Sequence, residues 1–159
     1  MARIFENSTC AICEHLLKDD DQEWFGTSGV FFEPHDPLEP YCDAPIHWNC
    51  YETWPYRERF AATHFESLIM IWAVLADRDN GYALNISKRE NEIGINPIEI
   101  GIPVNLELSS YDHWIHNPED ILRAMHPLKQ RAIRRIIPIL YQRFPTLEAL
   151  MLGTQKRQI

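Results

Sequence analysis

Long apolar segments are missing from this sequence of 159 residues. No stretch reaches about 18 consecutive apolar residues, so we expect no membrane-spanning helix. The start at Met1 lacks an apolar run followed by a cleavage site, which argues against a secretory signal and favours a cytoplasmic location. Only 6 glycines occur, and there is no Gly-rich phosphate loop, no G-x-S-x-G and no H-E-x-x-H. These absences exclude the familiar nucleotide-binding, serine-hydrolase and zinc-protease motifs.

Basic residues are outnumbered, with 15 Lys and Arg against 23 Asp and Glu and a net charge of −8. Residues 1–117 carry 20 acidic but only 7 basic side chains, whereas residues 118–159 carry 3 acidic and 8 basic ones. An acidic surface repels phosphate backbones, so the first part is not expected to bind nucleic acid. The basic C-terminal helix is the alternative nucleic-acid interface. Its regular apolar stripe favours a helix that neutralises the protein's own acids.

The four cysteines carry the strongest motif of the sequence. Cys10 and Cys13 form a C-x-x-C pair, and His47 and Cys50 form an H-x-x-C pair. In a reducing compartment such a set points to metal binding or catalysis rather than to disulfides. Thiolate and imidazole ligands suit tetrahedral zinc, which takes four protein ligands at a structural site. We therefore predict a structural Zn²⁺ ion bound by these four side chains.

Three alternatives to this ligand set stay open at the level of sequence. Cys42 is the competing fourth ligand in place of His47, or else a buried thiol beside the site. All four cysteines can also be ordinary buried residues that bind no metal. A thioredoxin-like redox pair at Cys10 and Cys13 is disfavoured, because no βαβ pattern surrounds them.

The order of elements around the two pairs resembles a treble-clef zinc finger. A loop follows the first pair, a short strand is expected at Gly29–Phe32, and the second pair sits where a helix begins. The segment Cys10–Glu14 also resembles the first pair of a RING finger. That resemblance covers only residues 8–60, and a RING finger needs a second complete zinc site. No cysteine follows Cys50, which argues against a ubiquitin ligase.

The rest of the chain alternates between helical and strand patterns. Residues 67–76 are apolar almost all round, which predicts a long buried helix from Tyr56 to the turn signal at 79–81. Strands are expected around 84–86, around 93–95 and over 98–108, with a break at Pro103. Helices are expected from Asn117, from Pro127 with a kink or division at Pro138, and over 146–152 before Gly153.

Candidate catalytic residues are few. Tyr111–His116 concentrates polar groups, and there Asp112 can orient His113 as a general base or His113 and His116 can bind a metal. His35 and Asp36 invite comparison with nucleases that place a histidine on a treble-clef hairpin. The local negative charge does not suit a phosphate substrate. We therefore assign no catalytic residue.

Together these patterns predict an α+β fold in which a treble-clef-like zinc module, residues 1–54, precedes an α+β domain, residues 55–159. The expected function is binding or regulation of another protein. One version is an inhibitor or immunity-type protein whose acidic face covers a basic site. The alternatives are a metal-dependent hydrolase or nuclease using His35, Asp36, Asp112, His113 or His116, and a nucleic-acid-binding zinc finger acting through the basic helix.

Overall fold

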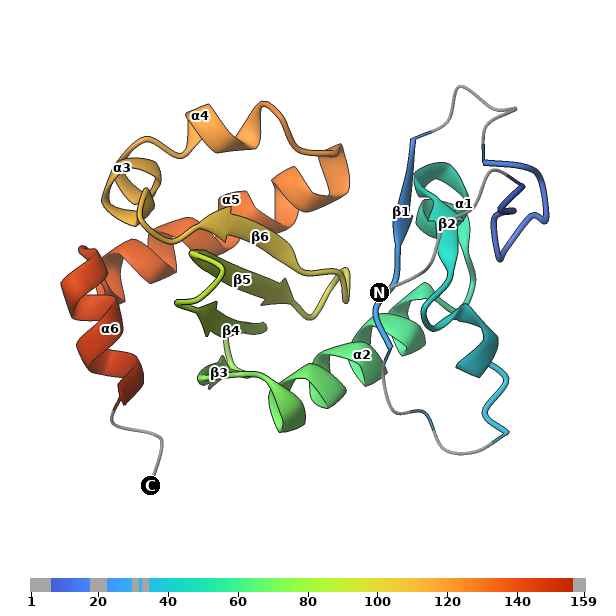
Figure 1. Ribbon diagram of the computed structural model, residues 1–159, viewed down its shortest axis with the longest axis horizontal. Coiled ribbons are helices and arrows are strands. Elements are labelled where there is room, and N and C mark those ends of the chain that lie inside the picture. Colours follow the sequence, from blue (N-terminus) through green and yellow to red (C-terminus); the bar gives the residue numbers. More distant parts are fainter. Residues whose placement is uncertain (1–6, 18–22, 30–31, 33–34, 156–159) are drawn as a thin grey trace. The chain divides into compact units, whose positions relative to one another are not determined.

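The computed structural model describes residues 7–17, 23–29, 32 and 35–155. The chain divides into two compact units, Met1–Ser67 and Leu68–Ile159. Helices and two small antiparallel sheets occur together, which confirms the expected α+β class (Figure 1). No helix in the described ranges is long and apolar enough to cross a membrane. The predicted boundary between residues 54 and 55 stays a prediction.

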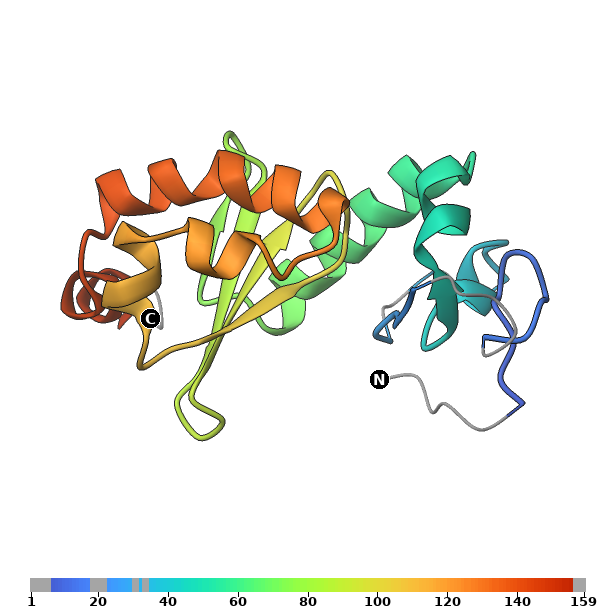
Figure 2. The ribbon, with the colours of Figure 1, turned by 90° about the horizontal axis from the view of Figure 1, so that it is seen from above.

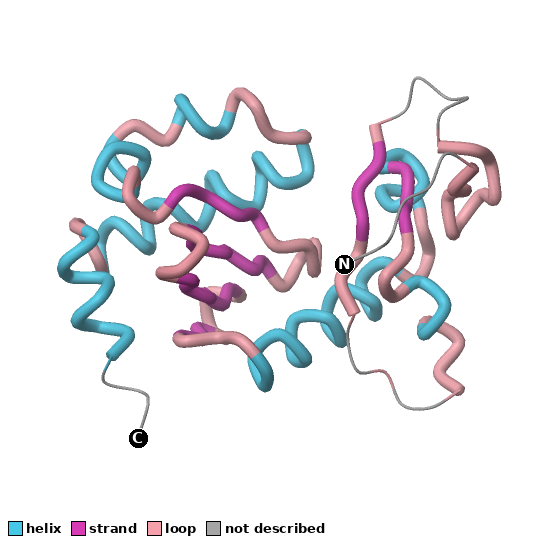
Figure 3. The backbone as a smooth tube through the Cα atoms, viewed as in Figure 1, coloured by secondary structure: helices cyan, strands magenta, loops and turns pink. Residues whose placement is uncertain are grey.

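The first unit is small and rich in loops. Strand β1 (Trp24–Gly26) pairs antiparallel with β2 (Pro45–His47), and α1 (Trp48–Thr53) follows β2 without a gap. The two strands of this pair lie side by side in the tube representation (Figure 3). A 3-10 helix, η1 (Glu39–Tyr41), lies in the connection between them. The expected strand at residues 29–32 falls partly outside the described residues, since only Gly29 and Phe32 belong to them and neither is in a strand.

Aromatic rings fill the interior of the first unit. Phe25 of β1 packs on Trp48 and Tyr51 of α1, at ring-centroid distances of 4.1 and 5.2 Å. Trp54 and Phe60 continue the cluster at 5.5 Å from one another. Such rings each bury a large apolar area, so a few of them stabilise a unit too small for an extended core.

Helix α2 (Arg57–Ile71) begins where the sequence indicates but ends earlier than predicted. The turn signal at residues 79–81 is real, yet it closes a hairpin instead of a helix, because strand β3 (Leu75–Asp77) lies between. The last residues of the apolar run are not buried: Met70 is 73% exposed and Trp72 is 65% exposed. The expectation of a helix buried on most faces up to residue 76 is therefore wrong. Val74 donates to the Leu84 carbonyl oxygen and Leu75 pairs with Leu84, and a longer helix would forfeit this sheet pairing.

The second unit is built on a four-stranded antiparallel sheet in the order β3–β4–β5–β6. Its other strands are β4 (Tyr82–Ser87), β5 (Glu92–Pro97) and β6 (Val104–Glu107). Period-two alternation predicted β4 and β5 well. The longer alternating stretch is a strand only after Pro103, because proline cannot donate to the ladder. The register places Leu84 opposite Ile95 and Ile93 opposite Leu106.

Four helices follow the sheet: α3 (Tyr111–His116), α4 (Glu119–Leu122), α5 (Pro127–Arg143) and α6 (Leu147–Gln155). Helix α5 lies along one face of the sheet (Figure 2), and Ile133, Ile136 and Leu140 join the strand residues in one core. The helix expected at residues 117–120 is confirmed as α4, but its N-cap is Pro118, while Asn117 caps the end of α3. Two further details differ from expectation: Pro138 does not divide α5, and Gly153 lies inside α6. A Cβ at Gly153 would meet the Phe144 ring at 2.4 Å, so close packing explains the glycine.

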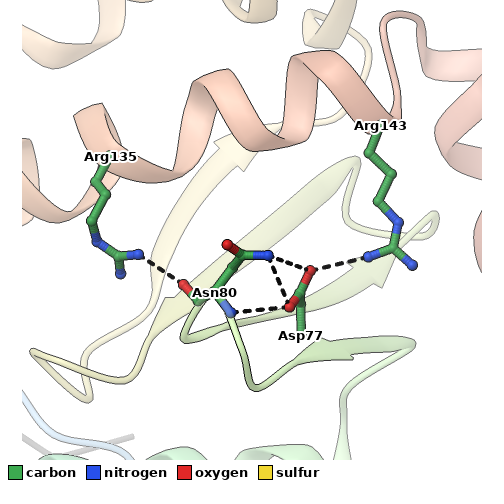
Figure 4. A network of polar contacts seen from close by, with 4 residues as sticks. All are labelled: Asp77, Asn80, Arg135 and Arg143. Carbon is green, nitrogen blue, oxygen red and sulfur yellow. Dashed lines mark hydrogen bonds and ion pairs between the residues drawn. The ribbon is translucent and has the colours of Figure 1, made fainter.

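The arginines of α5 make ion pairs with acids of the same unit. Arg134 pairs with Glu119, and Arg135 donates to the Asn80 carbonyl oxygen at 2.8 Å and lies 3.6 Å from Glu99. Arg143 lies 3.2 Å from Asp77, whose carboxylate also accepts bonds from Asn80 (Figure 4). This network links the β3–β4 turn to α5. It accords with the interpretation that the basic helix neutralises the protein's own acids.

The Asn85 side chain of β4 packs closely against the backbone of Gly94 on β5, and substitution of either residue tests this packing. A Cβ on Gly94 would lie 2.1 Å from Asn85 Oδ1, and Asn85 also accepts a hydrogen bond from the buried Asn96. We expect Gly94→Ala to lower the free energy of unfolding by about 1–3 kcal/mol, measured by urea denaturation. Adding Asn85→Ala removes the clash, so the double variant should be more stable than the sum of the single effects predicts. Strict additivity would contradict this packing.

Candidate metal centre

Cys10 and Cys13 lie in a tight knuckle that the backbone closes on itself. The Cys10 amide donates to the His15 carbonyl oxygen at 2.9 Å, and the Glu14 amide donates to the Cys10 carbonyl oxygen at 2.8 Å. Glu14 has a φ of 64°, a left-handed conformation that turns the chain back. A bridge between Thr9 and Leu16 completes the loop. The knuckle thereby directs both sulfurs to the same side.

His47 and Cys50 lie at the junction of β2 and α1. His47 is the last residue of β2 and the N-cap of α1, so Cys50 falls in the first turn of that helix. The Ala11 amide donates to the Pro45 carbonyl oxygen at 2.9 Å, which fastens the knuckle to β2. Buried Thr27 holds the other side of the junction: its hydroxyl donates to the Tyr41 carbonyl oxygen at 2.7 Å and accepts from the Ala44 amide at 2.9 Å.

The four predicted ligands come together at one point. One ligand atom from each of Cys10, Cys13, His47 and Cys50 lies within 4.8 Å of all the others. His47 Nδ1 lies 3.4 Å from Cys13 Sγ and 3.9 Å from Cys50 Sγ. The cluster can therefore hold a metal ion, as the pairing of the two motifs predicted. Cys42 is not a member of it, and none of the four cysteines is in a disulfide.

Burial and backbone amides set the acidity of the thiols. Burial opposes ionisation of Cys10, but hydrogen bonds from the amides of His47, Cys13 and Ile12 outweigh it, so the pKa of Cys10 is lowered. The His47 amide lies 3.4 Å from Cys10 Sγ. Burial and the neighbouring sulfurs raise the pKa of Cys50 to about 12. A cation between the sulfurs would reverse that preference, because it favours the thiolate of each.

The imidazole of His47 is oriented for ligation through one nitrogen. The residue is fully buried, Nδ1 faces the sulfurs, and Nε2 has no hydrogen-bond partner within the described residues. Ligation through Nδ1 leaves the proton on Nε2. The other nitrogen of a metal-bound histidine usually donates to a carbonyl or carboxylate, so this orphaned Nε2 is a departure from the common pattern.

The other polar candidates form local contacts rather than a second cluster. Asp36 pairs with Arg59 at 2.5 Å and accepts from the Leu38 amide, and the adjacent His35 has a φ of 73°. In the second unit, Asp112 accepts from the Leu147 amide at 2.5 Å and His113 lies 3.1 Å from Asp120. Because the Asp112 carboxylate accepts from Leu147 and His113 lies beside Asp120 instead, Asp112 does not orient His113. His116 Nδ1 donates to the backbone carbonyl oxygen of Asp112 at 2.8 Å. Within the described ranges, the Cys₃His group is the one cluster of potential metal ligands.

Sequence reasoning missed a buried histidine in the same unit. His64 of α2 is 1% exposed, and its Nε2 lies 2.8 Å from Ser28 Oγ, while its Nδ1 has no partner among the described residues. Burial lowers the pKa of His64 to about 4. Its position on the apolar face of a predicted helix was the available signal, but Ser28 is too distant in sequence for that pairing to be recognised.

Comparison with known proteins gave no further identification: no family model, no curated protein and no solved structure matches the chain.

The burial of His64 predicts how the free energy of unfolding depends on pH. The pKa of His64 is about 4 in the folded chain and about 6.5 when unfolded, so the unfolded state binds more protons between these values. His64 therefore does not reduce the free energy of unfolding above pH 6.5. Below pH 6.5 the free energy of unfolding falls as the pH is lowered toward 4, because the unfolded state gains a proton on His64 that the folded state does not bind. We expect wild type to lose about 2 kcal/mol more stability than His64→Gln between pH 7.5 and 5, measured by urea unfolding.

His113→Gln serves as the control for this experiment, because it makes the same substitution at an exposed histidine instead of a buried one. Metal release in acid affects all three proteins alike and cancels in the comparison. Equal pH dependence of wild type and His64→Gln would show that His64 is not held neutral by the fold.

Proposed function

We propose that the Cys₃His cluster binds a structural zinc ion and that the chain is a zinc-stabilised module for binding or regulating another protein. The observation that carries the proposal is the convergence of three sulfurs and one imidazole nitrogen from two separate segments. Tetrahedral zinc with Zn–S bonds of about 2.3 Å and Zn–N bonds of about 2.0–2.1 Å requires S···N separations near 3.6 Å. The two measured separations, 3.4 and 3.9 Å, bracket this value.

The ligand chemistry supports a structural rather than a catalytic ion. Three thiolates and an imidazole fill all four positions that zinc uses in structural sites, with no position left for water. Cys10 and His47 are fully buried, which limits access of a substrate to the centre. Zinc binding energy would then act as folding energy for a unit with a small aromatic core. The proposed arrangement is treble-clef-like: a knuckle, a strand pair, and a helix that carries the last ligand.

The surface of the first unit supports protein binding. Glu23, Glu39 and Asp43 are exposed there, and their charges add to the strongly acidic balance of residues 1–117. Trp24 is 42% exposed and Tyr56 is 56% exposed. Aromatic side chains are frequent anchors in protein interfaces, and surrounding acids steer a basic partner. The acidic run at residues 19–21 and Glu33, which we also expect on this surface, lie outside the described residues.

Metal analysis tests the zinc assignment. Purified wild type should contain close to one zinc ion per chain, whereas Cys10→Ser and Cys50→Ser should lose it and unfold at lower temperature, because a thiolate ligand is missing. Cys42→Ser is the matched control, since Cys42 lies outside the cluster, and it should retain the metal. Full zinc content in both ligand variants would refute the assignment. Loss of zinc from Cys42→Ser would make Cys42 a ligand.

Affinity purification from the source cell tests the binding role. Wild type and Cys42→Ser should recover the same basic protein, and Cys10→Ser should not, because its binding surface depends on the metal-stabilised fold. Mixing the purified pair at rising salt should slow association steeply and change dissociation little. Replacing Glu23, Glu39 and Asp43 with the neutral amides should slow association without removing zinc. A salt-independent association rate would contradict the role of the acidic surface.

A further inference from the structure

A groove in the second unit follows strand β3 along the edge of the sheet. β3 is the first strand in the order β3–β4–β5–β6, so no other described strand pairs with its outer side (Figure 1). Three hollows with volumes of about 470, 420 and 310 Å³ lie there. The first and second share Val74 in their lining, and the second and third share Ala76. We call this row of adjoining hollows the β3 groove.

The middle of the β3 groove is lined by apolar side chains and by exposed backbone, and it is open to solvent. Ile71 and Trp72 line it and are 40% and 65% exposed, and the adjoining Met70 is 73% exposed. Ile71 and Trp72 line the same hollow as Ala73 and Val74, so two large exposed apolar side chains share one surface there, unlike an isolated exposed leucine. Such patches commonly mark a surface that another protein covers. The middle hollow thus supplies the apolar part of an interface.

The two ends of the β3 groove carry opposite charges. Lys88 lines the hollow at one end and Asp79 lines the hollow at the other. Both residues are exposed, and neither has an ion-pair partner in the described part of the chain. Asp77 at the same end is already paired with Arg143, and Arg78 has an interaction of its own. Lys88 and Asp79 are therefore the charges available to an occupant.

We propose that the occupant is a second copy of this chain, docked across a two-fold axis with the two β3 strands side by side and antiparallel. A two-fold interface brings the same patch of both copies together. The apolar middle of one groove then meets the apolar middle of the other. Each Lys88 meets the partner copy's Asp79, so that the axis generates two ion pairs. An unrelated peptide would need its own matching sequence, whereas the chain already carries both charges in the required order.

Sedimentation equilibrium over a range of chain concentrations tests the proposal. Wild type should form dimers as the concentration rises, and Trp72→Asp should weaken dimerisation at least tenfold, because it places a charge in the apolar middle. Tyr141→Asp is the control, since Tyr141 is 45% exposed on α5 and lies outside the groove lining. It should leave the dimerisation constant unchanged.

Reversing the charge of Lys88 or of Asp79 tests the two proposed ion pairs directly. Lys88→Glu alone and Asp79→Lys alone each place like charges together twice, so each should weaken self-association roughly tenfold. An equimolar mixture of the two variants should recover dimers, because both contacts of the mixed dimer are again of opposite sign. Circular dichroism verifies that these exposed substitutions leave the fold intact. Monomeric wild type, including a monomer that captures an unrelated peptide, overturns the proposal, as does failure of the mixture to associate.

Discussion

The convergence of Cys10, Cys13, His47 and Cys50 is the constraint on which the first unit depends. Two segments that are distant in sequence supply the ligand atoms, and the hydrogen bond from Ala11 to Pro45 holds those segments together. Without a cation, burial of Cys50 and, after it, the neighbouring sulfurs of Cys10 and Cys13 raise the pKa of Cys50 to about 12. With a divalent ion, the same proximity becomes favourable. A short strand pair and a small aromatic core then need less stability of their own.

The cluster was predictable from sequence because its chemistry is local. A C-x-x-C pair and an H-x-x-C pair each place two ligands within one turn, and only their meeting required the fold. Spacing favoured His47 over Cys42 as the fourth ligand, because His47 lies three residues before Cys50 and Cys42 lies eight residues before it. The structure brings His47 into the cluster, where it ends β2 and caps α1. The contact between Ser28 and His64 could not be predicted, because nothing in the sequence relates those two positions.

The second unit shows where periodicity succeeds and where it fails. Alternation predicted β4 and β5, whose apolar residues face the core under α5. The apolar run at residues 67–76 misled because it contains a helix end, an exposed patch and a strand within ten residues. Periodicity cannot separate these, since all three are apolar and none is long. Ile71 and Trp72 of the exposed part line the β3 groove, so the pattern fails where we propose that two copies of the chain meet.

X-ray absorption at the zinc edge of the purified protein tests the central claim most directly, because it reports the ligand atoms without substituting any of them. A structural Cys₃His centre predicts a first shell of three sulfurs at about 2.3 Å and one nitrogen at about 2.0–2.1 Å, with no water. A shell of four sulfurs would transfer the fourth position to Cys42. A shell dominated by oxygen and nitrogen, or one with five or more ligands, would contradict a closed structural site at Cys10, Cys13, His47 and Cys50.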